Sequence, residues 1–305
     1  MRLLFIGGTR FSGRAAARLA VARGHQVDVF HRGRTPPGSV PGARDLVGDR
    51  MADRSALGTG DWDAVIDTCG FRPGEIHAMA DTLAGRCGHY LFVSSVSAYA
   101  PDIPHLSDES ARLADTSVLD PATLATVPVD NATYGPLKVL CEHAVLARHA
   151  RAAIVRPTFI VGPDDYTQRF PEWVRRLAAG GEVVAPGPGD AAVQFIDARD
   201  LAAFAVDLAE RGTQGTFNAA ATQDMFTFAD LLEGIAGAVA PAGTRLRWIP
   251  AAEAQASGQD FPLWAGGESS GLASVRSDAA RAHGLRCRPL ADTARDTLAW
   301  IRAAA

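Results

Sequence analysis

The chain has 305 residues, of which 21% are charged, and a formal net charge of −4. This slightly acidic balance predicts neither a nucleic-acid nor a membrane partner, and no apolar run approaches membrane-spanning length. The length suffices for one large α/β domain or two smaller ones, each with a full core.

The cysteines are scattered along the chain and form no C-x-x-C pair, which predicts neither a zinc site nor a disulfide framework. The N-terminus runs straight into an apolar strand, without the basic start and cleavage site of a signal peptide. Both observations predict a cytoplasmic protein without a bound metal. The cysteines are Cys69, Cys87, Cys141 and Cys287.

The first half of the chain alternates short apolar runs with helical stretches. This alternation predicts βαβ units and a doubly wound parallel sheet with helices on both faces. The expected strands are residues 3–6, 26–30, 64–67, 90–94 and 152–156, and the expected helices are residues 13–23, 75–85 and 133–149.

A glycine-rich turn joins the first strand to the first helix. Gly7 permits a tight turn, and Gly13 permits close packing of helix on strand. In this context the turn predicts a dinucleotide site, with the pyrophosphate on the helix N-terminus. Arg10 stands where the fingerprint has its middle glycine, and an ordinary βα turn is the alternative. The residues expected around the cofactor here are Gly7, Thr9, Arg10, Phe11 and Gly13.

The end of the second strand bears on the choice between NAD and NADP. NAD enzymes tend to place an acid there for the ribose 2′-hydroxyl, but this position falls on His31. Arg32, Arg34 and Arg10 together suit a 2′-phosphate. We therefore expect NADP(H), with NAD as the alternative cofactor and a solvated basic rim as the alternative role for the arginines.

Two aspartates are also expected on the cofactor side. We expect Asp49 near the adenine and Asp67 beside the phosphates, although Asp67 would serve equally well as a cap for the next turn.

The second half is less regular. Helices are expected at residues 170–179, 200–210, 228–239 and 291–303, strands at 194–196 and 216–218, and a segment rich in glycine and proline at 180–190. We predict a Rossmann-like NAD(P)-binding domain at residues 1–165. A smaller α/β substrate-binding region at residues 166–305 is expected to complete the first sheet with some of its segments.

Tyr134 and Lys138 are four residues apart on the helix expected at residues 133–149, so both lie on one face. A lysine ammonium in this position stabilises a phenolate, which lets the phenol exchange a proton nearer neutral pH than its free pKa of about 10 allows. A core tyrosine and a solvated lysine are the alternative interpretation.

These motifs together resemble the extended short-chain dehydrogenase/reductases of the NAD-dependent epimerase/dehydratase type. The glycine-rich opening is similar to that of an atypical subgroup that includes the chloroplast stem-loop-binding proteins. The resemblance rests on residues 6–13, 94–99, Tyr134 with Lys138, Arg156 with Pro157, residues 195–200 and 216–218.

The resemblance implies a role for each residue of the chemical site. Tyr134 would be the acid/base, and Lys138 would lower its pKa and hold the nicotinamide ribose. Ser95, at the end of the fifth strand, would orient the reacting oxygen, with Ser94 and Ser97 as substitutes. Pro157 would lie beside the cofactor. A homodimer through the helices at 75–85 and 133–149 is also implied.

Departures from the family narrow the reaction. Val96-Ser97 stands where dehydratases carry an acidic pair, which disfavours elimination, and Phe159 replaces an asparagine of UDP-galactose epimerases. Asp164-Asp165 would either cap a helix or bind substrate hydroxyls. Four further residues lie where the family binds substrate, although each is expected to be structural: Gln194, Arg199, Trp173 and Trp264.

The leading hypothesis is an NADP(H)-dependent oxidoreductase that interconverts a secondary alcohol and a ketone on a polyhydroxylated, sugar-like or nucleoside-like small molecule. An epimerase with tightly bound NAD is the runner-up. A non-catalytic NADP sensor and an RNA-binding protein are the alternatives of another class. Arg14 and Arg18 would extend the basic cluster in the RNA-binding case, but the acidic net charge disfavours it.

Overall fold

A seven-stranded, wholly parallel sheet forms the centre of the computed structural model, which describes residues 1–266 and 270–304. The strand order is β10-β6-β5-β4-β1-β2-β3. This confirms the predicted α/β, Rossmann-like fold class. The strands are β1 Arg2–Ile6, β2 Gln26–His31, β3 Arg44–Val47, β4 Ala64–Asp67, β5 Tyr90–Val93, β6 Ala152–Pro157 and β10 Gly215–Ala219.

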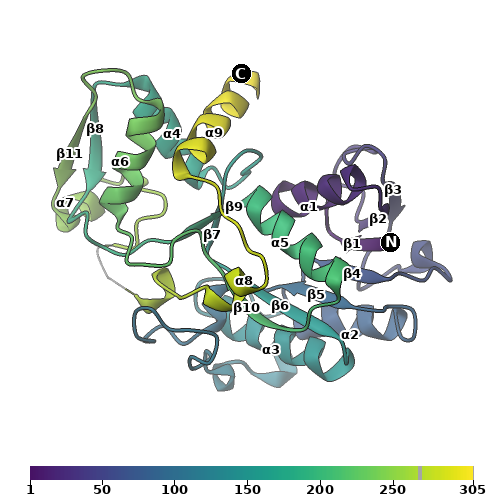
Figure 1. Ribbon diagram of the computed structural model, residues 1–305. Helices are drawn as coiled ribbons and strands as arrows, with labels where there is room; N and C mark the ends of the chain where they lie inside the picture. Colours follow the sequence, from purple (N-terminus) through teal and green to yellow (C-terminus); the bar gives the residue numbers. More distant parts are fainter. Residues whose placement is uncertain (267–269, 305) are drawn as a thin grey trace.

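Helices cover both faces of this sheet (Figure 1). Helices α1 (Phe11–Ala22) and α5 (Ala198–Arg211) pack together over one face, and α2 (Pro73–Thr82) and α3 (Tyr134–Arg148) pack over the other. Because both faces are covered, the inner strands are apolar almost throughout. The carboxyl ends of the strands meet the starts of α1, α2 and α3 at one edge, where ligands bind in such sheets.

The smaller part of the molecule, which we call the cap, has its own core around the fully buried Trp173. Helices α4, α6, α7 and α9 contribute to this core, and two short parallel pairs flank it, β8 with β11 and β7 with β9. The cap elements are β7 Phe159–Val161, α4 Arg169–Ala179, β8 Glu182–Pro186, β9 Phe195–Asp197, α6 Phe228–Val239, β11 Arg245–Ile249, α7 Ala251–Ala256 and α9 Leu290–Ala304.

Short helical elements complete the chain. Helix α8 (Asp278–Ala282) packs against β10. The 3₁₀ turns are η1 Ser55–Leu57, η2 Val96–Ala98, η3 Thr116–Val118, η4 Pro121–Thr123 and η5 Gly271–Ala273. Within the described residues no helix is long and apolar enough to cross a membrane.

Segments beyond residue 165 take part in the central sheet. β10 pairs with β6 at the sheet edge, and α5 packs on α1. The boundary predicted at residue 165 falls in the loop between β7 and α4.

Four strands, β3, β7, β8 and β11, were absent from the sequence-based prediction. β3 is half exposed at the sheet edge, and β8 lies in the segment rich in glycine and proline. β11 alternates charged and apolar residues on the outside of the cap. β3 and β11 lack the continuous apolar run that marked the inner strands, and β7 is only three residues long.

Candidate active site

The glycine-rich turn between β1 and α1 is packed too tightly for side chains at two positions. A Cβ at Gly7, whose φ is +96°, would lie 2.6 Å from Oγ1 of Thr68. A Cβ at Gly13 would lie 3.0 Å from the backbone of Gly8. Arg10 is the N-cap residue of α1 and has an extended backbone, so the missing middle glycine costs no strain.

The first turn of α1 is free to bind an anion. It contains no acidic residue, and no side chain of the N-cap residue bonds its amides. Thr9 and Phe11 flank this end of the helix and are both buried. Backbone N–H groups and the helix dipole favour a phosphate here, so the turn fits a dinucleotide pyrophosphate.

At the end of β2, His31 is used inside the chain. Its Nδ1 accepts a hydrogen bond from the amide of Gly33 (3.1 Å), so its Nε2 carries the proton and donates to Asp45 (3.1 Å). The buried ring is therefore a support for the turn after β2. Both ring nitrogens of His31 are engaged by these bonds, so neither is free for the expected contact with the cofactor.

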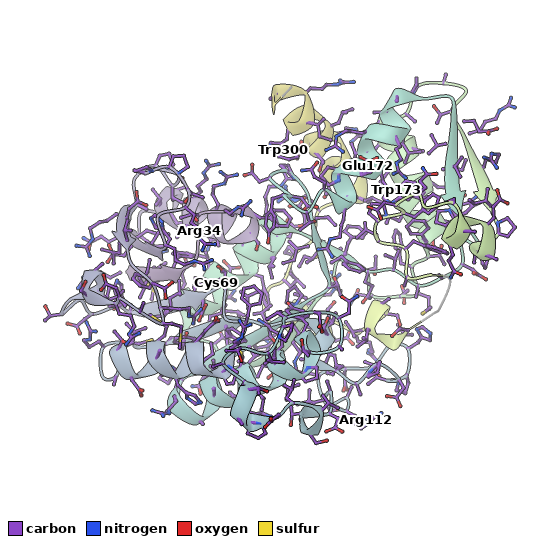
Figure 2. All side chains as sticks on the ribbon, turned by 180° about the vertical axis from the view of Figure 1, so that it is seen from behind. Arg34, Cys69, Arg112, Glu172, Trp173 and Trp300 are labelled. Atoms are coloured by element: carbon purple, nitrogen blue, oxygen red, sulfur yellow. The ribbon has the colours of Figure 1, made fainter. Side chains whose placement is uncertain are left out.

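Arg32 and Arg34 extend from the turn that His31 supports, and both are exposed. Neither has a salt bridge to another described residue. Asp49 lies close to them. The Met51 amide above all, and then the charges of Arg32 and Arg34, hold the pKa of Asp49 below its ordinary value. Figure 2 shows Arg34 on the same half of the molecule as Cys69, away from Trp173 in the cap.

Asp67 lies at the end of β4 with a fully buried carboxylate. Arg50 binds it through two nitrogens (2.7 and 3.2 Å), and the Tyr90 hydroxyl donates to it (2.7 Å). Burial alone would raise the pKa of Asp67, but Arg50 outweighs burial and holds this pKa below its ordinary value. The amide of Cys69 also bonds this carboxylate, so Asp67 caps the next turn. No local sequence pattern predicts the ion pair of Arg50 with Asp67, because the two residues follow different strands.

Lys138 is buried, with 3% of its surface exposed. Its Nζ donates to the carbonyl oxygens of Gly70 (3.0 Å) and Val93 (2.9 Å) and lies 4.1 Å from the centre of the Phe92 ring. An ammonium has three N–H donors, so within the described part of the chain one donor remains for another group. The solvated-lysine interpretation is thus excluded.

Tyr134 is the first residue of α3 and is partly exposed, unlike a core tyrosine. It lies one helical turn before Lys138, and its ring centre is 6.4 Å from that of Phe71. Phe71 follows Gly70, whose carbonyl binds Lys138. The tyrosine and the lysine therefore share one wall of the site.

The turn after β5 brings three serines to the same edge. The Ser95 hydroxyl donates to Ser97 Oγ (3.1 Å) and accepts from the Ser97 amide (3.0 Å), so it caps η2. Ser94 is buried and donates to Glu142 (2.5 Å), which Arg156 binds through two nitrogens. Ser94 is therefore occupied, whereas Ser95 and Ser97 are half-buried at this edge and bond each other.

Gly135 joins these two parts of the site. A Cβ at this position would lie 2.3 Å from the Ser97 carbonyl oxygen. Only glycine lets the first turn of α3, with Tyr134, approach the turn of Ser95 and Ser97 so closely. The sequence places this glycine directly after Tyr134, but no pattern reveals what it approaches.

A buried network supports the turn from below. Arg156 stacks on the Tyr99 ring at 4.5 Å, and the Tyr99 hydroxyl donates to the side chain of Asn218 (2.7 Å). The carboxylate of Glu109, from the long segment between β5 and α3, accepts a hydrogen bond from the backbone amide of Asn218 (2.8 Å). The motif residues 94–99, 156 and 218 therefore hold one another in place.

The residues expected on the substrate side are mostly structural. Trp173 is fully buried and donates to the Pro262 carbonyl, and Gln194 is bonded through both ends of its amide to Val275. Trp264 packs in the cap core, and Arg199 binds Asp197 and Asp296.

Asp164 and Asp165 have separate roles. Asp165 is fully buried and accepts the amide and hydroxyl of Thr167, so it caps the turn before α4. Asp164 forms a salt bridge with Arg14 on α1 (2.6 Å). Pro157 ends β6 at the carboxyl edge of the sheet.

Residues 75–220 match the family model described as the NAD dependent epimerase/dehydratase family. The matched segment runs from α2 to the residue after β10 and includes Ser95, Tyr134 and Lys138. The predicted resemblance is thereby confirmed at the family level.

Two curated relatives align with most of the chain. The chloroplast stem-loop binding protein of 41 kDa b from Arabidopsis thaliana is 26% identical over 262 residues, covering 79% of this chain and 63% of that protein. A 2-alkyl-3-oxoalkanoate reductase from Stenotrophomonas maltophilia is 30% identical over 232 residues, covering 67% and 64%. The chain therefore spans somewhat less than two thirds of the length of these relatives.

Solved structures share the whole fold. A UDP-N-acetylglucosamine 4-epimerase from Methanobrevibacter ruminantium, in complex with UDP-N-acetylmuramic acid, superposes with a TM-score of 0.74 at 14% identity. The match covers 100% of this chain and 99% of that chain. At this identity the likeness shows the fold shared with the family.

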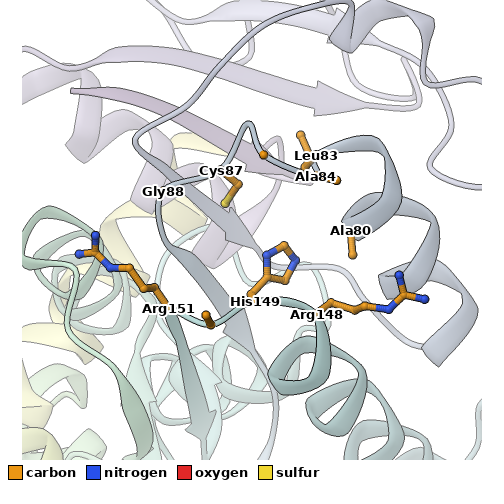
Figure 3. Close-up of a pocket in the computed structure, with 10 residues that line it drawn as sticks. Ala80, Leu83, Ala84, Cys87, Gly88, Arg148, His149 and Arg151 are labelled. Carbon is orange, nitrogen blue, oxygen red and sulfur yellow. The ribbon is translucent and has the colours of Figure 1, made fainter.

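Two cavities lie beside α2 and α3. One, of about 350 Å³, lies beyond the ends of α2 and α3, where His149 and Cys87 line it (Figure 3). Because α3 has 15 residues, this cavity is about 20 Å from Tyr134 along the helix. The other, of about 670 Å³, is an apolar groove between α2, α3 and residues 121–125. Within the described residues no cluster of metal-binding side chains occurs.

Proposed function

We propose that the chain is an NADP(H)-dependent reductase or dehydrogenase that interconverts a secondary alcohol and a ketone on a small polyhydroxylated, sugar-like or nucleoside-like molecule. The observation that carries the proposal is the close approach of the Tyr134 turn to the Ser95 turn through Gly135. It brings a phenol, a hydroxyl and the buried Lys138 ammonium to one edge of the sheet, beside a turn that fits a dinucleotide.

The cofactor and the side chains of the protein have separate parts in the proposed reaction. When bound, the nicotinamide supplies hydride transfer. Tyr134 gives or takes the proton on the substrate oxygen, and Ser95 holds that oxygen in place. Lys138, with one donor left after binding Gly70 and Val93, stabilises the phenolate of Tyr134 or binds a ribose hydroxyl of the cofactor.

The preference for NADP(H) rests on charge. Arg32 and Arg34 are exposed and have no salt bridge within the described residues, and Arg10 lies at the start of α1. Asp45, an acid near this point of β2, is bonded by His31 and by the amide of Gly38. Its carboxylate is therefore engaged, whereas the guanidinium groups are available for a 2′-phosphate.

Ketone reduction has support from the relative named as an oxoalkanoate reductase, and a sugar-like substrate has support from the solved UDP-sugar epimerase. Val96 and Ser97 after the active hydroxyl supply no acid for dehydration, and Phe159 at the start of β7 provides no amide for a nucleotide sugar.

An epimerase is the second candidate. It uses the same residues with a tightly held cofactor, which first takes and then returns the hydride. RNA binding, which the name of the Arabidopsis relative suggests, is a weaker candidate, because the net charge of −4 is acidic.

We also propose a homodimer through the outer faces of α2 and α3, in the cytoplasm. Leu146 on α3 is 52% exposed, and the apolar groove continues this surface. The four cysteines are free, as a reducing compartment requires.

The deciding experiment is to purify the protein, identify any retained nucleotide, and measure NADPH and NADH oxidation with a panel of ketones. We expect exchangeable nucleotide and a preference for NADPH. Tightly bound NAD+ without net turnover would favour the epimerase, and salt-sensitive RNA binding that NADPH does not compete away would favour the RNA-binding protein.

A further inference from the structure

The loop between β7 and α4 reaches from the cap to the start of α1 (Figure 1). Its Asp164 carboxylate lies 2.6 Å from a guanidinium nitrogen of Arg14. The Tyr166 ring lies 4.3 Å from the Arg10 guanidinium carbon and meets the Phe11 ring edge-on at 6.2 Å. The cap thus touches the glycine-rich turn at two points.

The inner part of the loop is fixed by its own bonds. Asp165 is buried and caps the turn, and Gln168 donates back to the Asp165 carbonyl. The Tyr166 side chain contributes little to the folding of the cap, because 57% of the residue is exposed. Its ring contacts are with Arg10 and Phe11, at the place where the pyrophosphate is expected.

We propose that Asp164 and Tyr166 form a clasp that retains the dinucleotide and orients Arg10 toward its phosphates. The inference rests on the proposed function, since it requires that a dinucleotide binds at this turn. Stacking on a ring uses the face of a guanidinium and leaves its N–H edge free for phosphate oxygens. Release of the cofactor past α1 then requires the loss of the Tyr166 stack and the Asp164–Arg14 salt bridge.

The test is the rate of NADPH release, measured by displacement with excess NADP+ in stopped-flow fluorescence. Tyr166→Ala removes the ring, whereas Tyr166→Phe keeps it. Asp164→Asn removes the charge and tolerates the positive φ of +68° at this position. Asp102→Asn, in an exposed pair with Arg112 on another loop, is the matched control.

We expect Tyr166→Ala to release NADPH about fivefold faster than the wild type and Asp164→Asn to release it a fewfold faster. Tyr166→Phe and Asp102→Asn should keep the wild-type rate. Unchanged release from Tyr166→Ala and Asp164→Asn, with NADPH still bound, would overturn the clasp alone. A wild-type protein that binds no dinucleotide would overturn the proposed function and the clasp together.

Discussion

Gly135 packs against the Ser97 carbonyl so closely that no side chain fits between them, since a Cβ on Gly135 would lie 2.3 Å from the Ser97 carbonyl oxygen. Gly135→Ala must push the first turn of α3 away from the Ser95 turn. We expect kcat/KM to fall tenfold to about a hundredfold, with NADPH affinity nearly unchanged. Gly237→Ala, at a helical glycine with open space around it, is the control and should keep full activity. Equal kinetics for the two variants would contradict the prediction.

Removal of the Tyr134 hydroxyl tests its role in proton transfer. Tyr134→Phe keeps the ring beside Phe71 but removes the acid/base group, so turnover should fall by a factor of about 10² to 10⁴. Cofactor affinity, measured by fluorescence titration, should stay near the wild-type value. A variant that retained most of its turnover would show that another group moves the proton.

The exposed arginines after β2 should select the cofactor. Arg34→Ala and Arg32→Ala each remove a charged hydrogen-bond partner of a 2′-phosphate, so the Kd for NADPH should rise about tenfold. The Kd for NADH should change little, and Arg245→Ala in the cap is a control that should affect neither. An equal loss of affinity for both cofactors would argue against a 2′-phosphate site.

The buried pair of Arg50 and Asp67 should matter for folding. Arg50→Met leaves the fully buried Asp67 carboxylate without its cation, and we expect the free energy of unfolding to fall by about 3–5 kcal/mol. Arg112→Met, in the exposed pair with Asp102, should have almost no effect in the same denaturant titration. Similar losses for the two variants would contradict this assignment.

Two histidines should make stability fall as the pH is lowered from about 7 to about 5. Burial lowers the pKa of His89 and of His149 below the ordinary value of 6.5. Below 6.5 the unfolded chain therefore takes up protons before the folded chain does, which reduces the free energy of unfolding. Denaturant titrations across this range should show the decline, and His89→Gln with His149→Gln should flatten it. A flat wild-type profile would contradict the prediction.

The sequence was sufficient for those features that local patterns specify. Residues 228–239 were predicted as a helix with the observed bounds, and the spacing of Tyr134 and Lys138 predicted a shared helical face. The glycine-rich turn was predicted because its tight packing needs glycine at fixed positions along the chain.

Features that depend on partners distant in sequence could not be predicted in this way. The pairing of His31 with Asp45 depends on β2 lying beside β3. That of Asp67 with Arg50 joins the end of β4 to the segment after β3, although β1 and β2 separate these strands in the sheet. Likewise, nothing local to Tyr166 indicates that it meets Arg10, which lies on the other part of the molecule.

The return of the chain from the cap to supply α5 and β10 limits how this protein can be altered. A chain cut at residue 165 would lose α5 from one face of the sheet and leave β6 as an unpaired edge, which invites aggregation. The cap therefore cannot be exchanged for another at a single junction. We therefore expect that point substitutions in the cap can change the substrate preference of this chain more readily than exchange of the part beyond residue 165 with that of another protein.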